Sequence, residues 1–400
     1  MSSASMHSSW IELDAQALRT NIQIFRGLLK KSAHAGGTPE PALGVVLKAN
    51  AYGHGLLEIL PVVHPLVDMI HLISPNDALE IRKMESERAW PQRRLLVIGA
   101  TEPDEYVRLA EAGVEVTLAD DGVPAAAAAL RSRGLRATAH VHIETGLSRE
   151  GFFPSEIAAK LAFLSSPDSP FLLRGVLSHF ANTEDVTEQQ YAETQLRNFA
   201  DGIREVGQLL GTQGTNLERH IAASAATLIL PDARCDSVRV GISLYGFWPS
   251  AETRLSARIV HPELPRLLPV LSWRCRSQII KDLPAGAYVG YGCSFRCERA
   301  TRIAVFPVGY FDGYPRLLSG RAHVLVNGHR AAVLGRVMMN HIVVDVTGIA
   351  GDDSPVVATL LGSDGQETVS AEMLAGWAQT IQYEICARLG AHLKRIVIEK

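Results

Sequence analysis

The sequence lacks the features that would direct a chain into a membrane, through a secretory pathway or onto nucleic acid. No apolar stretch reaches the roughly 18 residues that a membrane span requires. The first ten residues, MSSASMHSSW, lack the charged and then apolar pattern of a signal peptide. The net charge of −3 provides no basic surface for nucleic acid. We therefore expect a cytoplasmic protein with no membrane or nucleic-acid partner.

Cysteine is scarce, and the spacing of the cysteines indicates neither a disulfide bond nor a metal site. There are five cysteines, an odd number, and none forms a CxxC pair. Cys293 and Cys297 are the only close pair, and no partner for a metal is evident beside them. We expect reduced thiols and no metal site.

Residues 44–241 alternate between apolar runs and helix-compatible segments. Eight runs are strand-like, and segments rich in Ala, Leu and Glu lie between them. The runs are residues 44–48, 69–74, 94–99, 114–119, 138–143, 172–179, 218–223 and 237–241. Eight such units predict an α/β fold with an N-terminal (β/α)8 TIM-like barrel. A doubly wound sheet is the alternative, but no GxGxxG loop follows any of these strands.

The remainder of the chain has a different pattern. Short β-rich runs with turn residues, including the hairpin signal Asn327-Gly328, indicate a C-terminal mostly-β domain. A helical stretch at 371–389 and a last strand at 395–398 close the chain. We expect residues 14–260 to form the barrel and 261–400 the C-terminal domain, with a strand in 1–13 packing on the latter.

Lys48 is the most informative single residue. It follows the apolar run Val45, Val46, Leu47 in the segment GVVLKANAYGHG, where Asn50 and the glycines break the strand. Burial lowers the pKa of a lysine and favours the neutral, nucleophilic amine that a Schiff base with an aldehyde cofactor needs. The alternative is a lysine that extends to solvent along its own aliphatic stem.

Other reactive side chains fall at equivalent places. The active sites of barrels lie at the carboxyl ends of the strands. Those ends carry the following residues: Lys48, Arg149, His179, Ser224, Arg239 and Gly241. Each has a structural alternative: Arg149 as a surface charge, His179 as a core histidine, Ser224 as a helix N-cap. Their common position on one rim favours an active site.

Several motifs together resemble the alanine racemase family, and the resemblance covers roughly residues 8–398. The motifs are KANAYGHG at 48–55, ASAAT at 223–227, VRVGISLYG at 238–246, VGYGCSF at 289–295, PVGYFDGYPR at 307–316 and GRVMMNHIVVDVT at 335–347. The resemblance implies a pyridoxal 5'-phosphate enzyme, an isomerase that interconverts L-alanine and D-alanine and serves either D-alanine biosynthesis or D-alanine breakdown. It also implies a homodimer with shared active sites.

The resemblance assigns a role to each site residue. Lys48 would form the aldimine with the cofactor and act as one base, and Tyr291 of the second subunit would be the other. Tyr52, Ser224, Gly241 and Ile242 would bind the phosphate. His179 would stack near the ring and Arg239 would face the pyridine nitrogen. Arg149 and Met339 would bind substrate, and Tyr310 would line the entrance.

The sequence departs from the family at three positions. His142 stands where many members have a carbamylated lysine that supports the arginine, so another group, such as Glu144 or an anion, must orient Arg149. Asn340 replaces an aspartate, and Ala391 replaces a phosphate-binding tyrosine. The loss of a phenol at position 391 would open space beside the substrate, and apolar pockets reject an extra methylene only weakly. The sequence therefore leaves open a broad-specificity amino-acid racemase. A non-catalytic cofactor carrier and a decarboxylase of the same architecture fit the motifs less well.

Overall fold

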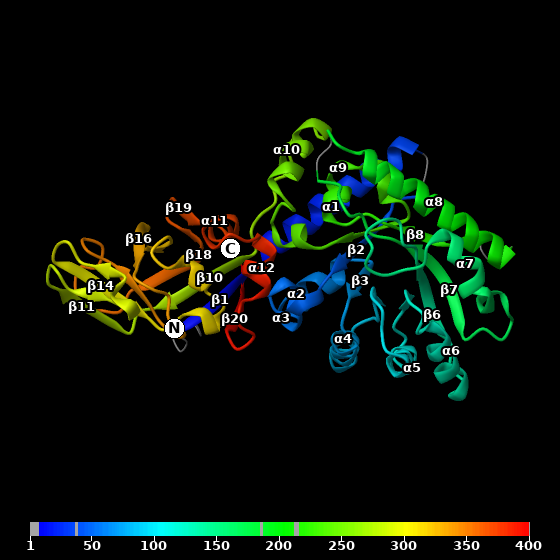
Figure 1. Cartoon of the computed structure of the whole chain (residues 1–400), viewed down its shortest axis with the longest axis horizontal. Helices are drawn as coiled ribbons and strands as arrows, with labels where there is room; N and C mark the ends of the chain where they lie inside the picture. The colour runs from blue at the N-terminus through cyan, green and yellow to red at the C-terminus, as the bar shows by residue number, and fades with distance from the viewer. Residues whose placement is uncertain (1–7, 37–38, 185–186, 212–215, 400) are drawn as a thin grey trace. The chain divides into compact units, whose positions relative to one another are not determined.

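The chain folds into two compact units. The computed structural model describes residues 8–36, 39–184, 187–211 and 216–399 (Figure 1). The β unit consists of Met1–Leu18, Ala49–Val62 and Leu268–Lys400, and the barrel unit of Arg19–Lys48 and Val63–Leu267. Residues 1–7 of the predicted N-terminal segment lie outside the described residues. The domain boundaries at residues 13 and 260 stay a prediction.

Eight parallel strands close the barrel unit. They are β2 (Ala42–Val46), β3 (Met69–Leu72), β4 (Arg94–Val97), β5 (Val116–Leu118), β6 (Ala137–His142), β7 (Phe171–Leu177), β8 (Glu218–His220) and β9 (Ser237–Val240). They form two four-stranded sheets, β4-β3-β2-β9 and β5-β6-β7-β8. The parallel bridges Leu96 to Glu115 and Ala223 to Arg239 join the two sheets into a ring. The predicted (β/α)8 barrel is confirmed.

Helices lie before, between and after these strands along the chain. These segments are helical because their apolar residues recur at a helical period. They are α1 (Ala15–Gly36), α3 (Leu56–Val63), α4 (Pro75–Glu87), α5 (Pro103–Glu111), α6 (Val123–Ser132), α7 (Pro154–Lys160), α8 (Gln190–Leu210), α9 (Ser224–Ile229) and α10 (Ala251–Val260). In α8 the residues Ala192, Phe199 and Val206 are buried on one face. Helices α4 to α8 lie outside the strands in Figure 1. Among the described residues, no helix is both long and apolar enough to cross a bilayer.

The β unit is built on a ten-stranded sheet. Its order is β11-β14-β17-β16-β15-β18-β10-β1-β20, and β19 pairs with β18. The strands are β1 (Ser9–Asp14), β10 (Leu271–Arg276), β11 (Ile279–Leu283), β14 (Thr301–Phe306), β15 (His323–Val326), β16 (His329–Leu334), β17 (Ile342–Asp345), β18 (Val357–Asp364), β19 (Glu367–Val369) and β20 (Lys394–Ile398). A hairpin, β12 (Tyr288–Val289) with β13 (Phe295–Arg296), and the helices α11 (Ala371–Ala378) and α12 (Gln382–Ala387) complete it. The predicted mostly-β character of this domain is confirmed.

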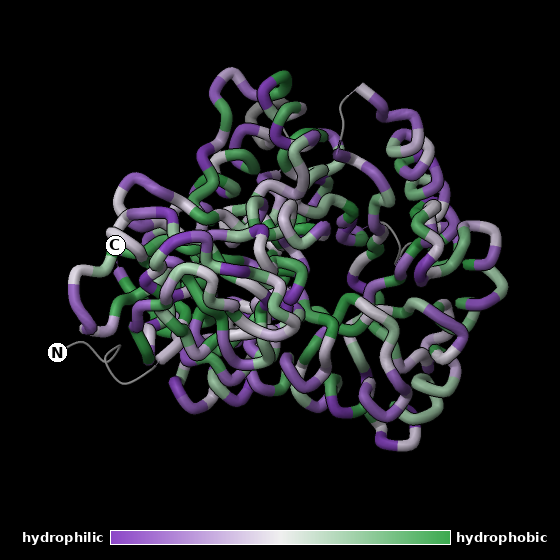
Figure 2. The backbone as a smooth tube through the Cα atoms, turned by 60° about the vertical axis from the view of Figure 1, so that its left-hand side comes forward, coloured by the Kyte–Doolittle hydropathy of each residue, from purple (hydrophilic) through white to green (hydrophobic). Residues whose placement is uncertain are grey.

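The first strand of the chain belongs to this sheet. Strand β1 pairs antiparallel with β10 and parallel with β20, so Ile11 lies beside both Trp273 and Arg395. Ile11 and Leu13 are buried while Glu12 and Asp14 are partly exposed, as expected for a strand with one face on a core, and the neighbouring Trp10 is buried as well. Figure 2 shows hydrophobic segments separated by hydrophilic ones along the tube.

Candidate active site

Lys48 lies just beyond the carboxyl end of β2, at the start of the short segment α2 (Lys48–Tyr52). Burial lowers the pKa of its amine, and the positive charges of Arg149 and Arg239 lower it further, while Glu150 opposes them. The sequence predicted that burial lowers the pKa of this lysine, but not the influence of the neighbouring charges. A partly desolvated amine among guanidinium groups is closer to the neutral, nucleophilic form than an exposed lysine is.

The backbone after Lys48 forms a left-handed turn. Ala49, Asn50, Ala51 and Tyr52 have φ values of 55°, 53°, 52° and 53°. Each costs roughly 1–2 kcal/mol in a residue with a Cβ atom. Four such residues in sequence are found where surrounding contacts enforce the conformation, and such places are frequently functional sites.

Contacts within the β unit hold this turn. The Arg395 guanidinium donates from Nε and Nη2 to the Gly53 carbonyl, at 3.0 and 2.8 Å. Gly53 has φ +80°, and a Cβ atom there would lie 1.9 Å from the Cys386 carbonyl oxygen. The side chain of Asn50 accepts from the Leu56 N–H at 2.8 Å. The turn is therefore fixed by packing rather than by local preference.

Tyr52 is the last residue of the turn and is buried. Burial raises the pKa of its phenol, so the side chain stays neutral and retains a proton to donate. Its ring lies 6.3 Å from that of Tyr383, measured between centroids. A neutral phenol is suited to bind a phosphate, and this role of Tyr52 stays a prediction.

A group of hydrogen-bond donors lies where β8 and β9 end. The Ser224 hydroxyl oxygen accepts from the Gly241 N–H at 2.9 Å, which leaves the hydroxyl proton free to donate. Ile242 begins the 3-10 helix Ile242–Tyr245, so its N–H has no acceptor within that helix. The Ser243 hydroxyl is buried and has no partner among the described residues. This unpartnered donor, next to Ser224 and the Ile242 N–H, fits an anion such as a phosphate, while the Gly241 N–H is bonded to the Ser224 oxygen.

The structure excludes one alternative for Ser224. Ala223, not Ser224, is the N-cap of α9, and no side chain caps that helix. The Ser224 hydroxyl instead contacts the turn that follows β9. The interpretation of Ser224 as a helix N-cap is wrong.

Arg239 lies within β9 and is buried in the barrel unit. Its Nη2 donates to the Ser178 carbonyl at 2.5 Å and to the His179 Nδ1 at 3.3 Å. Burial lowers the pKa of Arg239 to about 10, so the guanidinium is charged at pH 7. Burial together with Arg239 and Arg149 lowers the pKa of His179 to about 3, so that imidazole is neutral.

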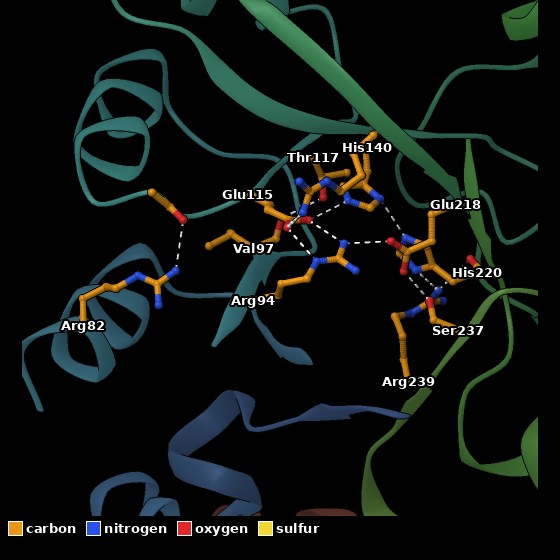
Figure 3. Close-up of polar contacts among 12 residues, drawn as sticks. Arg82, Arg94, Val97, Glu115, Thr117, His140, Glu218, His220, Ser237 and Arg239 are labelled. Carbon is orange, nitrogen blue, oxygen red and sulfur yellow. Dashed lines mark hydrogen bonds and ion pairs between the residues drawn. The ribbon is translucent and has the colours of Figure 1, made fainter. Parts of the chain in front are cut away.

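A relay of side chains leads from Arg239 across the barrel interior to a carboxylate (Figure 3). Arg239 Nη1 lies 2.9 Å from His220 Nδ1, His220 Nε2 lies 3.0 Å from His140 Nδ1, and His140 Nε2 lies 2.8 Å from Glu115 Oε2. A guanidinium only donates, so His220 Nδ1 accepts and its proton is on Nε2. The same reasoning places the His140 proton on Nε2, where it donates to Glu115.

Glu115 closes the relay with two further cations. Arg94 donates to both of its oxygens at 2.9 and 3.0 Å, and Arg174 donates at 2.7 Å. Burial raises the pKa of the Glu115 carboxyl, but His140 and Arg94 outweigh it and hold this pKa well below its usual range. The buried charges of Arg239 and Glu115 are thus connected through two imidazoles.

Arg149 is in the loop after β6, and two acidic residues hold this loop. Glu144 Oε2 accepts from the Arg149 backbone N–H at 3.2 Å. The guanidinium instead pairs with Glu150, whose Oε1 lies 2.8 Å from Nη2. His142 is buried, and its Nδ1 has no hydrogen-bond partner among the described residues. Glu144 therefore orients the backbone of Arg149, and Glu150 contacts its side chain.

In the β unit the structure brings Tyr291, Tyr310 and Met339 to one cavity. The cavity has a volume of about 480 Å³, and Asn340 and Arg336 also line it. The Tyr310 N–H donates to the Met338 carbonyl at 3.0 Å, which places the loop of Tyr310 against that of Met339. Tyr291 is 72% exposed, so its phenol is open to a group outside this unit.

Comparison with known proteins decides the family. A profile described as "Alanine racemase, N-terminal domain" matches residues 13–249, and one described as "Alanine racemase, C-terminal domain" matches residues 270–397. The chain belongs to the alanine racemase family. A Leptospira interrogans alanine racemase is 35% identical over 98% of this chain and 96% of that protein. One from Syntrophobacter fumaroxidans is 37% identical over 96% of each chain.

Solved alanine racemases have the same fold. The Streptomyces coelicolor enzyme superposes with a TM-score of 0.84 at 28% identity and covers 100% of both chains. The Bacillus anthracis enzyme, solved with bound L-Ala-P, gives a TM-score of 0.84 at 28% identity over 98% of this chain and 96% of that one. The likeness extends over both units of the chain.

Sequence reasoning did not identify several residues of this alanine racemase homologue that lie beside the predicted site residues or are linked to Arg239 through the relay. They are Glu115, His140, Glu150, His220 and Ser243. A signal existed for Glu115, because a charged residue inside the apolar run 114–119 is costly unless it is paired. His220 lies in a predicted strand, where the sequence does not distinguish a core histidine from one beside Arg239.

Proposed function

We propose that this protein is a pyridoxal 5'-phosphate-dependent alanine racemase, an isomerase that interconverts L-alanine and D-alanine. The observation that carries the proposal is Lys48, an amine of lowered pKa at the end of a barrel strand, followed by an enforced left-handed turn. Membership of the family supports the reaction and the cofactor.

The residues present fit the cofactor. Ser224 and Ile242 would hold the phosphate through a hydroxyl and a backbone N–H group, and Tyr52 would add its neutral phenol. The Gly241 N–H donates to the Ser224 oxygen and would orient that hydroxyl toward the phosphate. His179 would lie against the ring and Arg239 would face the ring nitrogen. Once bound through Lys48, the cofactor withdraws electrons from the substrate Cα and makes its proton acidic.

Arg239 controls the strength of that withdrawal. Its charge at pH 7 disfavours a proton on a ring nitrogen placed beside it. By keeping that nitrogen unprotonated, Arg239 would favour rapid return of the proton to the substrate Cα over side reactions. The relay to Glu115 holds the guanidinium in place for this purpose.

Racemisation needs proton transfer on both faces of the substrate Cα. Lys48 Nζ would remove or return the proton on one face. The partner subunit's Tyr291 would serve the other, which requires a homodimer with shared active sites. The high exposure of Tyr291 within one chain supports a role that a second copy completes. Arg149 and the Met339 backbone N–H would bind the substrate carboxylate, and Tyr310 would line the entrance.

The setting of the enzyme follows from the same features. The five cysteines are free thiols in the structure, which supports a reducing compartment such as the cytoplasm. The net charge of −3 supports a small amino acid rather than nucleic acid as the partner. D-alanine biosynthesis is the role we propose for the reaction.

A broad-specificity racemase is the second candidate, because Asn340 lines the cavity beside Tyr291 and Ala391 is small.

The test is to supply the purified protein and pyridoxal phosphate with L-alanine, L-serine, L-lysine or L-methionine. Fast conversion of alanine alone supports the alanine-specific function, and comparable conversion of larger substrates supports the second candidate. No conversion of any amino acid by cofactor-loaded protein would overturn both.

A further inference from the structure

We infer that Glu150 is a positioning residue for Arg149, and this inference rests on the substrate-binding role proposed for that arginine. Glu150 Oε1 accepts from Arg149 Nε at 3.1 Å and from Nη2 at 2.8 Å. Hydrogen bonds between two ionised groups are stronger than neutral ones, and the two contacts fix the plane of the guanidinium.

The carboxylate has its own anchor. Glu150 Oε2 accepts from the Ala100 N–H at 3.2 Å, in the loop that follows β4. The side chain of Glu150 is 15% exposed, whereas that of Arg149 is 52% exposed. Glu150 is therefore held by a neighbouring loop, and the guanidinium is held by Glu150.

The backbone forces two consecutive side chains to meet. Consecutive residues of an extended strand point to opposite faces, so contact between Arg149 and Glu150 requires a turn. Ser148 has φ 60° and Gly151 has φ 107°, both in the left-handed region. The Gly151 N–H donates to the Ala119 carbonyl at 2.7 Å, and a Cβ atom at Gly151 would lie 2.9 Å from the Glu144 nitrogen. The turn is thus tightly held.

The other ionisable groups nearby do not replace Glu150. His142 Nδ1 lies 3.9 Å from Glu150 Oε1, and burial with Arg239 and Arg149 lowers the pKa of His142 to about 3. A neutral imidazole neither pairs with Arg149 nor neutralises Glu150. Glu144 contacts the loop backbone through the N–H groups of Gly146 and Arg149.

One edge of the guanidinium remains available. Among the described residues, Arg149 Nη1 has no hydrogen-bond partner, while Nε and Nη2 contact Glu150. Nη1 can therefore bind a carboxylate of the substrate or an oxygen of the cofactor ring. Glu150 sets the direction in which this donor points.

The experiment compares Glu150→Leu and Glu150→Gln with wild-type holoenzyme. Titration calorimetry measures the affinity for propionate, a carboxylate without an amine, and alanine kinetics give KM and kcat. Glu150→Leu should weaken propionate binding and raise KM about tenfold, a factor worth about 1.4 kcal/mol, with kcat changed less than about threefold. Glu150→Gln keeps an oxygen that accepts from Arg149, so its effect should be intermediate. It also preserves the side-chain shape if Glu150→Leu does not fold.

Glu105→Gln is the matched control, because Glu105 pairs with Arg108 on the barrel unit's surface through bonds of 2.7 and 2.8 Å. It should change neither propionate affinity nor KM. If removal of the Glu150 charge leaves propionate binding unchanged or tightens it, Glu150 does not position Arg149 for a carboxylate and the inference is wrong. Failure of the proposed function is distinguishable, since wild-type holoenzyme would then not racemise alanine at all.

Discussion

His220 Nδ1 accepts a hydrogen bond of 2.9 Å from Arg239 Nη1, and this contact links the buried arginine of the candidate site to a carboxylate on the far side of the barrel interior. The His220 carbonyl accepts from the same Nη1 at 2.7 Å. Burial and the Arg239 charge hold the pKa of His220 well below its usual value. The imidazole is therefore a neutral acceptor, and the orientation of Arg239 depends on the residues behind it.

The relay predicts a large stability loss for Glu115→Gln. Glu115 is 5% exposed and accepts from His140, Arg94 and Arg174. Removing one charge of a buried network leaves the others uncompensated, so the free energy of unfolding should fall by about 3 kcal/mol. Urea unfolding measures the change. Glu105→Gln is the control, because Glu105 pairs with Arg108 at the surface. This change should lower the free energy of unfolding by less than about 1 kcal/mol. An equal effect of the two changes would contradict the role of the relay.

Buried neutral histidines predict a loss of stability in acid. The pKa values of His54, His142 and His179 are lowered from 6.5 to about 3, in each case mainly by burial. Between pH 6.5 and 3 the unfolded chain binds protons at these sites and the folded chain does not. The contribution of these histidines to the free energy of unfolding is therefore fully present above pH 6.5. As the pH falls through this window, each histidine lowers the free energy of unfolding by about 1.4 kcal/mol per pH unit.

Unfolding free energies measured at several pH values between 7 and 4 test this prediction. His54→Gln should reduce the slope, because one of the three groups is removed. His329→Gln, which changes an exposed histidine, should leave the slope unchanged. A stability that does not vary between pH 6.5 and 4 would show that these imidazoles are protonated in the folded protein.

Lys48→Ala should abolish covalent retention of pyridoxal phosphate. The amine of Lys48 has a pKa that is lowered by burial and by the charges of Arg149 and Arg239. Borohydride reduction of the wild-type protein, followed by peptide mass mapping, should place the cofactor on Lys48. Lys160→Ala removes a lysine paired with Asp121 and Glu156 and should retain the cofactor. If the reduced cofactor is found on another lysine, that lysine and not Lys48 binds pyridoxal phosphate.

The sequence predicted the barrel well because parallel strands in a barrel are apolar and regularly spaced. All eight predicted runs overlap observed strands, from β2 (Ala42–Val46) to β9 (Ser237–Val240). Strand β18 (Val357–Asp364) was not predicted, although it lies between β15 and β10 in the large sheet. Its short apolar run is equally compatible with a buried helix, and periodicity alone does not separate the two.

The site residues with distinctive neighbours along the chain were recognisable, and those defined only by contacts were not. Lys48 ends an apolar run and precedes a glycine-containing turn, so its environment was predictable. Glu150 reads as an ordinary surface charge, because its pairing depends on the left-handed backbone of Ser148 and Gly151. His140 and His220 meet only when β6 and β8 close into the barrel.

Tyr291→Phe should lose at least about a hundredfold in racemisation while the cofactor is retained, because general acid–base catalysis contributes factors of this size. Tyr288→Phe is the matched control: Tyr288 is 58% exposed, lies three residues away and does not line the cavity of Tyr291. The measurement is the rate of D-alanine formation at saturating cofactor. Near-normal activity of Tyr291→Phe would remove this tyrosine as the second base.

The most direct test of the central claim is the fate of the Cα hydrogen of L-alanine in deuterated water. Proton NMR follows loss of the Cα signal, and chiral chromatography follows the enantiomers in the same sample. A two-base alanine racemase should incorporate deuterium at Cα and bring the two enantiomers to equal amounts, and Lys48→Ala should do neither. If cofactor-loaded protein leaves the alanine in the L form with its hydrogen in place, the protein is not an alanine racemase.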